Sequence, residues 1–113
     1  MKLETHEGPY ADPAEAGDIA RVVAGLTQVG KAYVVLSDGD YLEEMYVQAA
    51  GTVGEHFIIE WRDGRAGDHY RGDRRVSTDE LVAVLAGYLR RDPDWSAALT
   101  WHRVRFDLEP ARA

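Results

Sequence analysis

The sequence predicts an α+β fold, with a single antiparallel sheet of about five strands and two helices packed on one face. Three observations lead to this prediction. Segments with the alternation or apolar content of strands follow one another between residues 32 and 71, with no helical segment among them. One helical segment precedes this run and another follows it. The length of 113 residues suits one domain over residues 1–113, with residues 1–10 as a short arm that is either a strand or frayed, and residues 109–113 as a tail.

The first helix is expected between residues 12 and 30. Asp12 can cap it, Pro13 suits the first helical position, and Glu15 completes the spacing of a capping box. Gly30 can end it. Because two glycines interrupt the segment, a helix that begins near Asp18 remains an alternative. The expected buried stripe consists of Ile19, Val22, Val23 and Leu26.

Four consecutive strands should follow, joined by hairpin turns. The first three are an apolar run at 32–36, a weakly alternating segment at 44–49 and a clearly alternating segment at 56–62. In the third strand, Phe57, Ile59 and Trp61 share the core side. Asp63-Gly64 is the strongest two-residue hairpin signal in the chain, so the fourth strand is expected from Arg65 to about Arg71.

The hairpin of residues 56–71 has two possible registers. A two-residue loop and a three-residue loop give different facing pairs: Ile59 with Asp68 and Phe57 with Tyr70 in the first, Ile58 with Asp68 and Phe57 with His69 in the second. A slip of one residue exchanges the two faces of a strand. We favour the first register because it directs Tyr70 into the core. The outer face would then hold His56, Ile58, Glu60, His69 and Arg71.

The second helix is expected to begin at Ser77, whose spacing from Glu80 is that of a capping box. Val76 and Leu81 have the spacing of a hydrophobic staple, and Pro93 prevents the helix from continuing. The buried stripe should consist of Leu81, Val84, Leu85, Tyr88 and Leu89. A last strand then carries Trp101. Apolar side chains on both faces of that strand are typical either of a covered strand or of a partner surface.

The composition argues against several classes of function. The chain has no cysteine, which excludes disulfides and thiolate chemistry and fits a reducing cytoplasm. Its first 18 residues contain no apolar run, so we expect no cleaved signal peptide, and no apolar segment is long enough to span a membrane. The net charge of −7 disfavours binding to nucleic acids. We therefore expect a cytoplasmic protein that binds neither membranes nor nucleic acids.

The acidic surplus lies outside the segment from Trp61 to Arg75. That segment has five arginines and three aspartates, so the rest of the chain carries a net charge of −9. A basic protein partner would be attracted to such a surface. The simpler interpretation is that the charge keeps the protein soluble. The candidate binding residues are Trp101 and five carboxylates near the N-terminus: Glu4, Glu7, Asp12, Glu15 and Asp18.

The outer face of the hairpin comes closest to a catalytic constellation. Glu60 and His69 would be diagonal neighbours, and a Glu–His pair can perform general acid–base catalysis when the two groups touch. With His56 they offer at most three metal ligands and no known metal-binding spacing, so no metal and no cofactor are expected. The sequence contains no standard enzyme motif. We interpret these side chains, and the Arg71-Gly72-Asp73 tripeptide, as structural.

The second half of the chain resembles a family of small bacterial proteins. The stretches FIIEWRDG, DHYR and STDELVAVLAGYLRRDPDWSAALTWHRV carry the resemblance, which covers roughly residues 45–106. They resemble the first large immunity family of polymorphic toxin systems, with matching positions at Glu60, Asp63-Gly64, His69-Tyr70, Tyr88, Asp94-Trp95 and Trp101. The resemblance implies an antiparallel sheet with flanking helices, and a non-catalytic cytoplasmic protein that blocks a cognate toxin.

Three functions therefore remain open. The leading hypothesis is a non-catalytic, acidic protein-binding module whose partner is a basic protein, such as a nuclease or deaminase toxin. The second is a small hydrolase or isomerase that uses Glu60 and His69. The third is a structural domain that forms a homodimer through an exposed strand edge. Both a monomer and a homodimer are compatible with the sequence.

Overall fold

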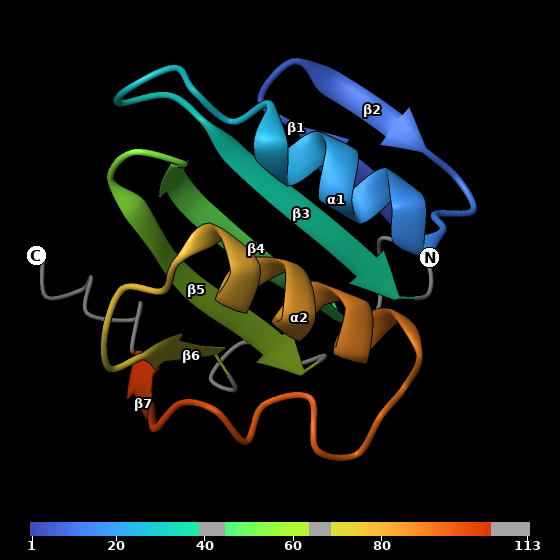
Figure 1. Cartoon of the computed structure of the whole chain (residues 1–113). Coiled ribbons are helices and arrows are strands. Elements are labelled where there is room, and N and C mark those ends of the chain that lie inside the picture. The colour runs from blue at the N-terminus through green and yellow to red at the C-terminus, as the bar shows by residue number, and fades with distance from the viewer. Residues whose placement is uncertain (39–44, 64–68, 105–113) are drawn as a thin grey trace, which may run out of the picture.

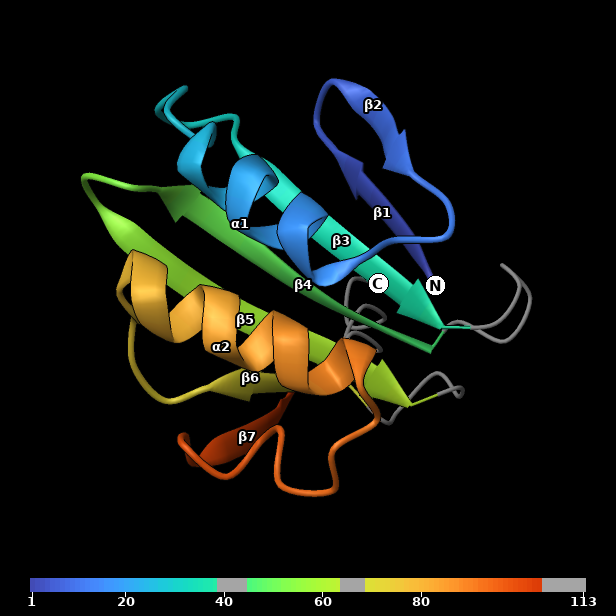
Figure 2. The ribbon, with the colours of Figure 1, turned by 45° about the vertical axis from the view of Figure 1, so that its right-hand side comes forward.

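The computed structural model describes residues 1–38, 45–63 and 69–104. In these residues seven strands form one antiparallel sheet in the order β2-β1-β3-β4-β5-β6-β7. Both helices pack on the same face of this sheet, as Figure 1 and Figure 2 show. The predicted fold class is confirmed. The elements are β1 (Lys2–Thr5), β2 (Gly8–Ala11), α1 (Ala16–Ala24), β3 (Tyr33–Asp38), β4 (Met45–Thr52), β5 (His56–Asp63), β6 (His69–Gly72), α2 (Thr78–Leu89) and β7 (Trp101–Val104).

The two additional strands lie in the N-terminal residues, for which the sequence leaves open a strand or a frayed arm. Residues 2–11 form the β1–β2 hairpin, and β1 also pairs with β3. Leu3 faces Leu36 in this pairing, and both side chains are fully buried. Removing these side chains from water stabilises the hairpin on the sheet. The arm is therefore part of the core architecture.

The first helix is shorter than predicted at both ends. Glu15, not Asp12, is the N-cap, and it forms a capping box with Asp18. The segment before Glu15 is not helical. Its Ala14 N–H donates to the Met1 carbonyl at 2.8 Å, which ties this connection to the start of the chain. At the other end the helix stops at Gly25, well before Gly30. The Leu26 carbonyl accepts instead from the Val53 N–H of the β4–β5 turn, so that group is no longer available to continue the helix.

The second helix begins as predicted. Ser77 Oγ accepts from the Glu80 N–H at 3.2 Å, and Glu80 Oε1 accepts from the Ser77 N–H at 2.9 Å. These two bonds satisfy backbone donors that the first turn leaves free. Val76 and Leu81, the expected staple residues, are both buried. Beyond the end of the helix, the Arg91 guanidinium binds the Asp38 carboxylate at 2.5 and 2.8 Å, which ties this end of α2 to the end of β3.

The core lies between the helices and the sheet face that they cover. The fully buried side chains alternate along the strands, as a sheet with one covered face requires. α1 and α2 also contact each other over this face. None of the helices in the described part of the chain is both long and apolar enough to cross a bilayer. The largest core residues are Phe57, Leu3, Ile19, Leu26, Leu36, Ile59, Leu81 and Leu85.

The pairing of β5 with β6 corrects both predicted registers. The facing pairs are Glu60 with Arg71, Trp61 with Tyr70 and Arg62 with His69. Relative to the favoured register the strands are shifted by four residues, since Tyr70 was expected to face Phe57. A shift by an even number leaves every side chain on its predicted face. A two-residue turn at Asp63-Gly64 would make Arg62 face Arg65, whereas Arg62 faces His69 in the structure. Residues 64–68, where most of the fourth strand was expected, lie outside the described residues.

Aromatic packing explains why the observed register is preferred. Trp61 stacks on Tyr70 with ring centroids 4.6 Å apart, a contact that adds to the free energy gained from burial. Gly72 lies opposite Trp101 in the β6–β7 pairing. A Cβ at Gly72 would lie 3.0 Å from Leu99 Cδ1 and 3.4 Å from the Trp101 ring. The local turn signal at Asp63-Gly64 is outweighed by these non-local contacts.

Adjacent isoleucines test the assignment of the two sheet faces. Ile59 is fully buried, whereas Ile58 is half-buried on the opposite face. We expect Ile59→Ala to lower the free energy of unfolding by about 2–5 kcal/mol, because it leaves a cavity in the core. Ile58→Ala should cost roughly 1 kcal/mol or less. Urea denaturation followed by tryptophan fluorescence measures both values. Equal losses for the two variants would contradict the assignment.

Candidate functional site

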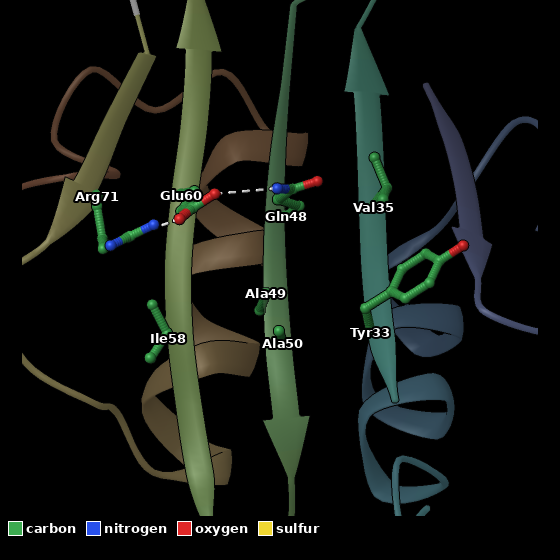
Figure 3. Close-up of a pocket in the computed structure, with 8 residues that line it drawn as sticks. All are labelled: Tyr33, Val35, Gln48, Ala49, Ala50, Ile58, Glu60 and Arg71. Atoms are coloured by element: carbon green, nitrogen blue, oxygen red, sulfur yellow. Dashed lines mark hydrogen bonds and ion pairs between the residues drawn. The ribbon is translucent and has the colours of Figure 1, made fainter. Parts of the chain in front are cut away.

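The face of the sheet opposite the helices carries a shallow depression, shown in Figure 3. We call this face the open face. The depression has a volume of about 660 Å³ and spans β3 to β6. Its lining combines an apolar floor with a polar side near β6. The lining residues are Tyr33, Val35, Gln48, Ala49, Ala50, Ile58, Glu60 and Arg71.

Strand alternation brings seven of these side chains together from four different strands, whereas the Ala49 side chain is buried in the core. Val35 faces Gln48, Gln48 faces Glu60, and Glu60 faces Arg71, so the four residues form one row across the sheet. The next row on the same face contains Tyr33, Ala50 and Ile58. Neighbouring side chains on one face of an antiparallel pair are close enough to interact. The open face thus presents a polar row beside an apolar row.

Glu60 is the centre of the polar row. Its Oε2 accepts from Arg71 Nε at 2.6 Å. Its Oε1 accepts from Gln48 Nε2 at 3.2 Å and is 3.1 Å from His69 Nε2. Because an ionised carboxylate can only accept hydrogen bonds, the His69 Nε2 atom must carry the proton. Three side chains from the two neighbouring strands, β4 and β6, therefore fix the orientation of one carboxylate.

Two opposing effects determine the pKa of Glu60. Burial raises it, since a desolvated carboxylate is less stable in its charged form. The hydrogen bonds from Arg71 and His69, the positive charge of Arg71 and the hydrogen bond from Gln48 lower it, and together they hold the pKa below its ordinary value. Glu60 is therefore ionised at neutral pH.

The geometry meets only the first requirement of the catalytic hypothesis, which is contact between Glu60 and His69. Glu60 and His69 are in contact, as predicted, and they are diagonal neighbours even in the corrected register. A carboxylate that is held by three donors and has a lowered pKa is, however, a weak general base. The His69 side chain is only 5 % exposed, so a substrate on the open face would not reach it. The arrangement is better suited to orienting side chains than to transferring protons.

The second histidine of β5–β6, His56, does not extend this cluster. His56 lies four residues from Glu60 along β5, away from His69, so these three side chains do not converge. Within residues 1–38, 45–63 and 69–104, no group of three His, Asp or Glu side chains could hold a metal ion. In the Arg-Gly-Asp tripeptide, the Asp73 N–H donates to the Thr100 carbonyl at 2.9 Å, and Asp73 Oδ1 accepts from the Thr100 N–H at 3.4 Å. These bonds give Asp73 a structural role between β6 and β7.

The five candidate carboxylates near the N-terminus do not form one cluster. Glu4 lies on β1 and contacts Lys2 at 3.6 Å. Glu7 is exposed at the turn between β1 and β2. The other three lie at or just before the N-terminal end of α1: Asp12, Glu15 and Asp18. Asp18 is also engaged by Arg21 at 2.7 Å.

Trp101 lies in an aromatic cluster on the helix side of the sheet. Its ring centroid is 6.3 Å from that of Trp61 and 6.1 Å from that of Trp95. Its Nε1 donates to the Ser96 carbonyl at 2.9 Å. Trp95 also contacts Tyr88 edge-on, with ring centroids 5.0 Å apart. Trp101 is thus part of the packing at the β7 edge and remains half-exposed there.

Sequence analysis did not identify Tyr33, Gln48 or Ala50 as site residues. The alternation of residues 44–49 did place Gln48 on the face opposite Val47, but nothing in that pattern indicated which strand would lie beside it. Comparisons of this chain with protein-family models, with curated proteins and with solved structures found no match.

The pH dependence of stability tests the state of Glu60. Its pKa is lower in the folded protein than the ordinary value of 4.5, so the folded state binds fewer protons than the unfolded state. The resulting stabilisation is present above the unfolded pKa and is lost as the pH falls through the folded pKa. Between about pH 5 and about pH 3, Glu60→Gln should therefore lose less stability than the wild type.

Urea denaturation at each pH provides the measurement. Glu80 has a pKa of about 2 because of its hydrogen bonds with Arg74 and Ser77, and it is unchanged in Glu60→Gln. The difference between the two proteins therefore reports on Glu60. As a positive control, Glu80→Gln should also flatten the pH profile. Parallel profiles for wild type and Glu60→Gln would show that Glu60 is not stabilised as a carboxylate.

Proposed function

We propose that this chain is a non-catalytic, cytoplasmic protein-binding module that neutralises a toxin, as the resemblance to immunity proteins implies. The observation that carries the proposal is the open face. Its depression has an apolar floor that is accessible at Tyr33 and Ala50, beside a polar row whose geometry is fixed by hydrogen bonds. A preformed apolar surface with a polar border is typical of protein interfaces.

The charge of the chain supports a basic partner. A net charge of −7 attracts a basic protein over distances of roughly a Debye length, which is about 8 Å at physiological salt. Glu7 and Asp12 are exposed on the N-terminal hairpin and its connection to α1. The same charge disfavours nucleic acid as the ligand. A basic nuclease or deaminase toxin is the partner class that fits these features.

The hydrolase or isomerase hypothesis is the weaker alternative. It would need Glu60 to exchange a proton, whereas three donors stabilise its charged form. If it were correct, Glu60→Gln would abolish turnover of a substrate while the protein stays folded. The binding hypothesis requires no turnover of a substrate. It predicts instead that the chain protects cells against a toxin.

A co-expression experiment tests the proposed function. If the proposal is correct, the genes beside that of this chain should include one for a toxin domain, and this domain, expressed in a bacterial host with and without the chain, is the probe. A neighbourhood without a toxin gene would count against the proposal. We expect growth to be restored when the chain is present, and the two purified proteins to form a stoichiometric complex. Loss of growth in both cultures, together with the absence of a complex, would refute the proposal.

Charge reversal tests the contribution of the acidic surface. Glu7→Lys/Asp12→Lys should slow association with the toxin domain on the order of tenfold at low salt, with little effect at high salt, because steering is electrostatic. The matched control Asp79→Lys/Asp94→Lys changes the net charge equally at exposed positions on and after α2. Stopped-flow measurements at two salt concentrations give the rates. Equal slowing in both variants would assign the effect to net charge rather than to the N-terminal region.

A further inference from the structure

A second depression extends the first toward the beginning of β3. It has a volume of about 330 Å³ and includes Gly30, Lys31, Glu55 and Arg75 in its lining. The two depressions share Tyr33, Ala50 and Ile58. They therefore form one continuous trough along the strands of the open face, with these three residues at its middle.

The middle of the trough is shaped to receive a large side chain. Ala50 faces Tyr33 on one side and Ile58 on the other in the strand pairing. A methyl group between two large side chains leaves a hollow between them. Tyr33 is 43 % exposed, so a considerable part of the ring is available to a partner. Apolar hollows of this kind bind the anchor residues that dominate interface energies.

The rim of the trough differs in charge from the rest of the molecule. Among the residues that the structure describes, three cations border it, Lys31, Arg71 and Arg75, against the two carboxylates of Glu55 and Glu60. Glu60 is already bound by Arg71, Gln48 and His69. The described part of the rim thus carries a surplus of positive charge, whereas the whole chain carries −7.

Arg71 is the cation best prepared to bind a ligand. The hydrogen bond from its Nε to Glu60 holds the guanidinium in place, while 52 % of the side chain is exposed. A guanidinium that is already oriented loses less conformational freedom when it binds. Its planar geometry matches a carboxylate, which can accept two parallel hydrogen bonds.

We propose that the trough docks a segment of the partner that carries a large apolar side chain next to a carboxylate. The apolar side chain fills the hollow over Ala50, and the carboxylate pairs with Arg71. This inference rests on the proposed function and specifies its contact. It is compatible with a basic partner, because net charge acts over long distances whereas the contact is decided by the nearest groups.

Two substitutions test the two parts of this contact. Ala50→Arg fills the hollow and should weaken binding to the adjacent toxin domain at least on the order of a hundredfold. Its control is Ala20→Arg, at an exposed alanine on α1. Arg71→Gln should weaken binding on the order of tenfold, because the carboxylate loses its partner. Its control is Arg90→Gln, which removes an exposed arginine whose carboxylate contact, to Asp92, is 3.8 Å long.

Isothermal titration calorimetry gives the affinities, and thermal melting shows whether each variant is folded. Should Ala50→Arg fail to fold, Tyr33→Ala provides the same test without added bulk and should weaken binding on the order of tenfold. Wild-type affinity in the folded hollow variants would overturn this inference and leave the proposed function intact. Absence of binding by the wild type would overturn both. A wild-type homodimer that Ala50→Arg dissociates, seen by sedimentation, would identify a second copy as the occupant and would also overturn the inference.

Discussion

The alternation along β5 is the constraint on which the rest of the structure depends. Phe57 and Ile59 point into the core and are fully buried, while Ile58 and Glu60 point to the open face. Because the side-chain period of a strand is two, one choice decides both faces at once. Burial of Phe57 and Ile59 in the core is favourable, and it also places Ile58 and Glu60 on the open face. The site is therefore a consequence of core packing rather than of a dedicated loop.

The open face contains a charged group whose burial is compensated locally. Glu60 is mostly enclosed, which opposes its ionisation, and its neighbours on β4 and β6 outweigh that penalty. A half-buried carboxylate without these donors would be destabilising. The compensation has a structural consequence: Gln48, His69 and Arg71 are held in defined positions by one acceptor. This preorganisation favours recognition of a partner more than proton transfer, since the carboxylate is stabilised in its charged state.

Charge acts on this molecule at two length scales. The acidic surplus of the whole chain attracts a basic partner over distances near the Debye length. The described residues that line the trough on the open face have a local surplus of the opposite sign around an apolar centre. These two features are compatible, because long-range steering affects the rate of association while local complementarity affects specificity and dissociation. The net charge of the chain does not indicate where the trough lies or which charge it carries.

Local signals in the sequence were sufficient for the fold class, for the start of α2 and for the faces of β5. The Ser77 capping box is satisfied within a few residues, and the period of two is a property of each strand by itself. The N-terminal hairpin, the start of α1 and the β5–β6 register depended on tertiary structure. Each of them is decided by partners outside the local segment: Leu36 for Leu3, Met1 for Ala14, and Tyr70 for Trp61. The contact between Glu60 and His69 was predictable because the favoured register and the observed register both make them diagonal neighbours. Tyr33, Gln48 and Ala50 joined the site only through the pairing of β3 with β4 and of β4 with β5, since neighbours in a sheet are set by non-local contacts that no single segment encodes.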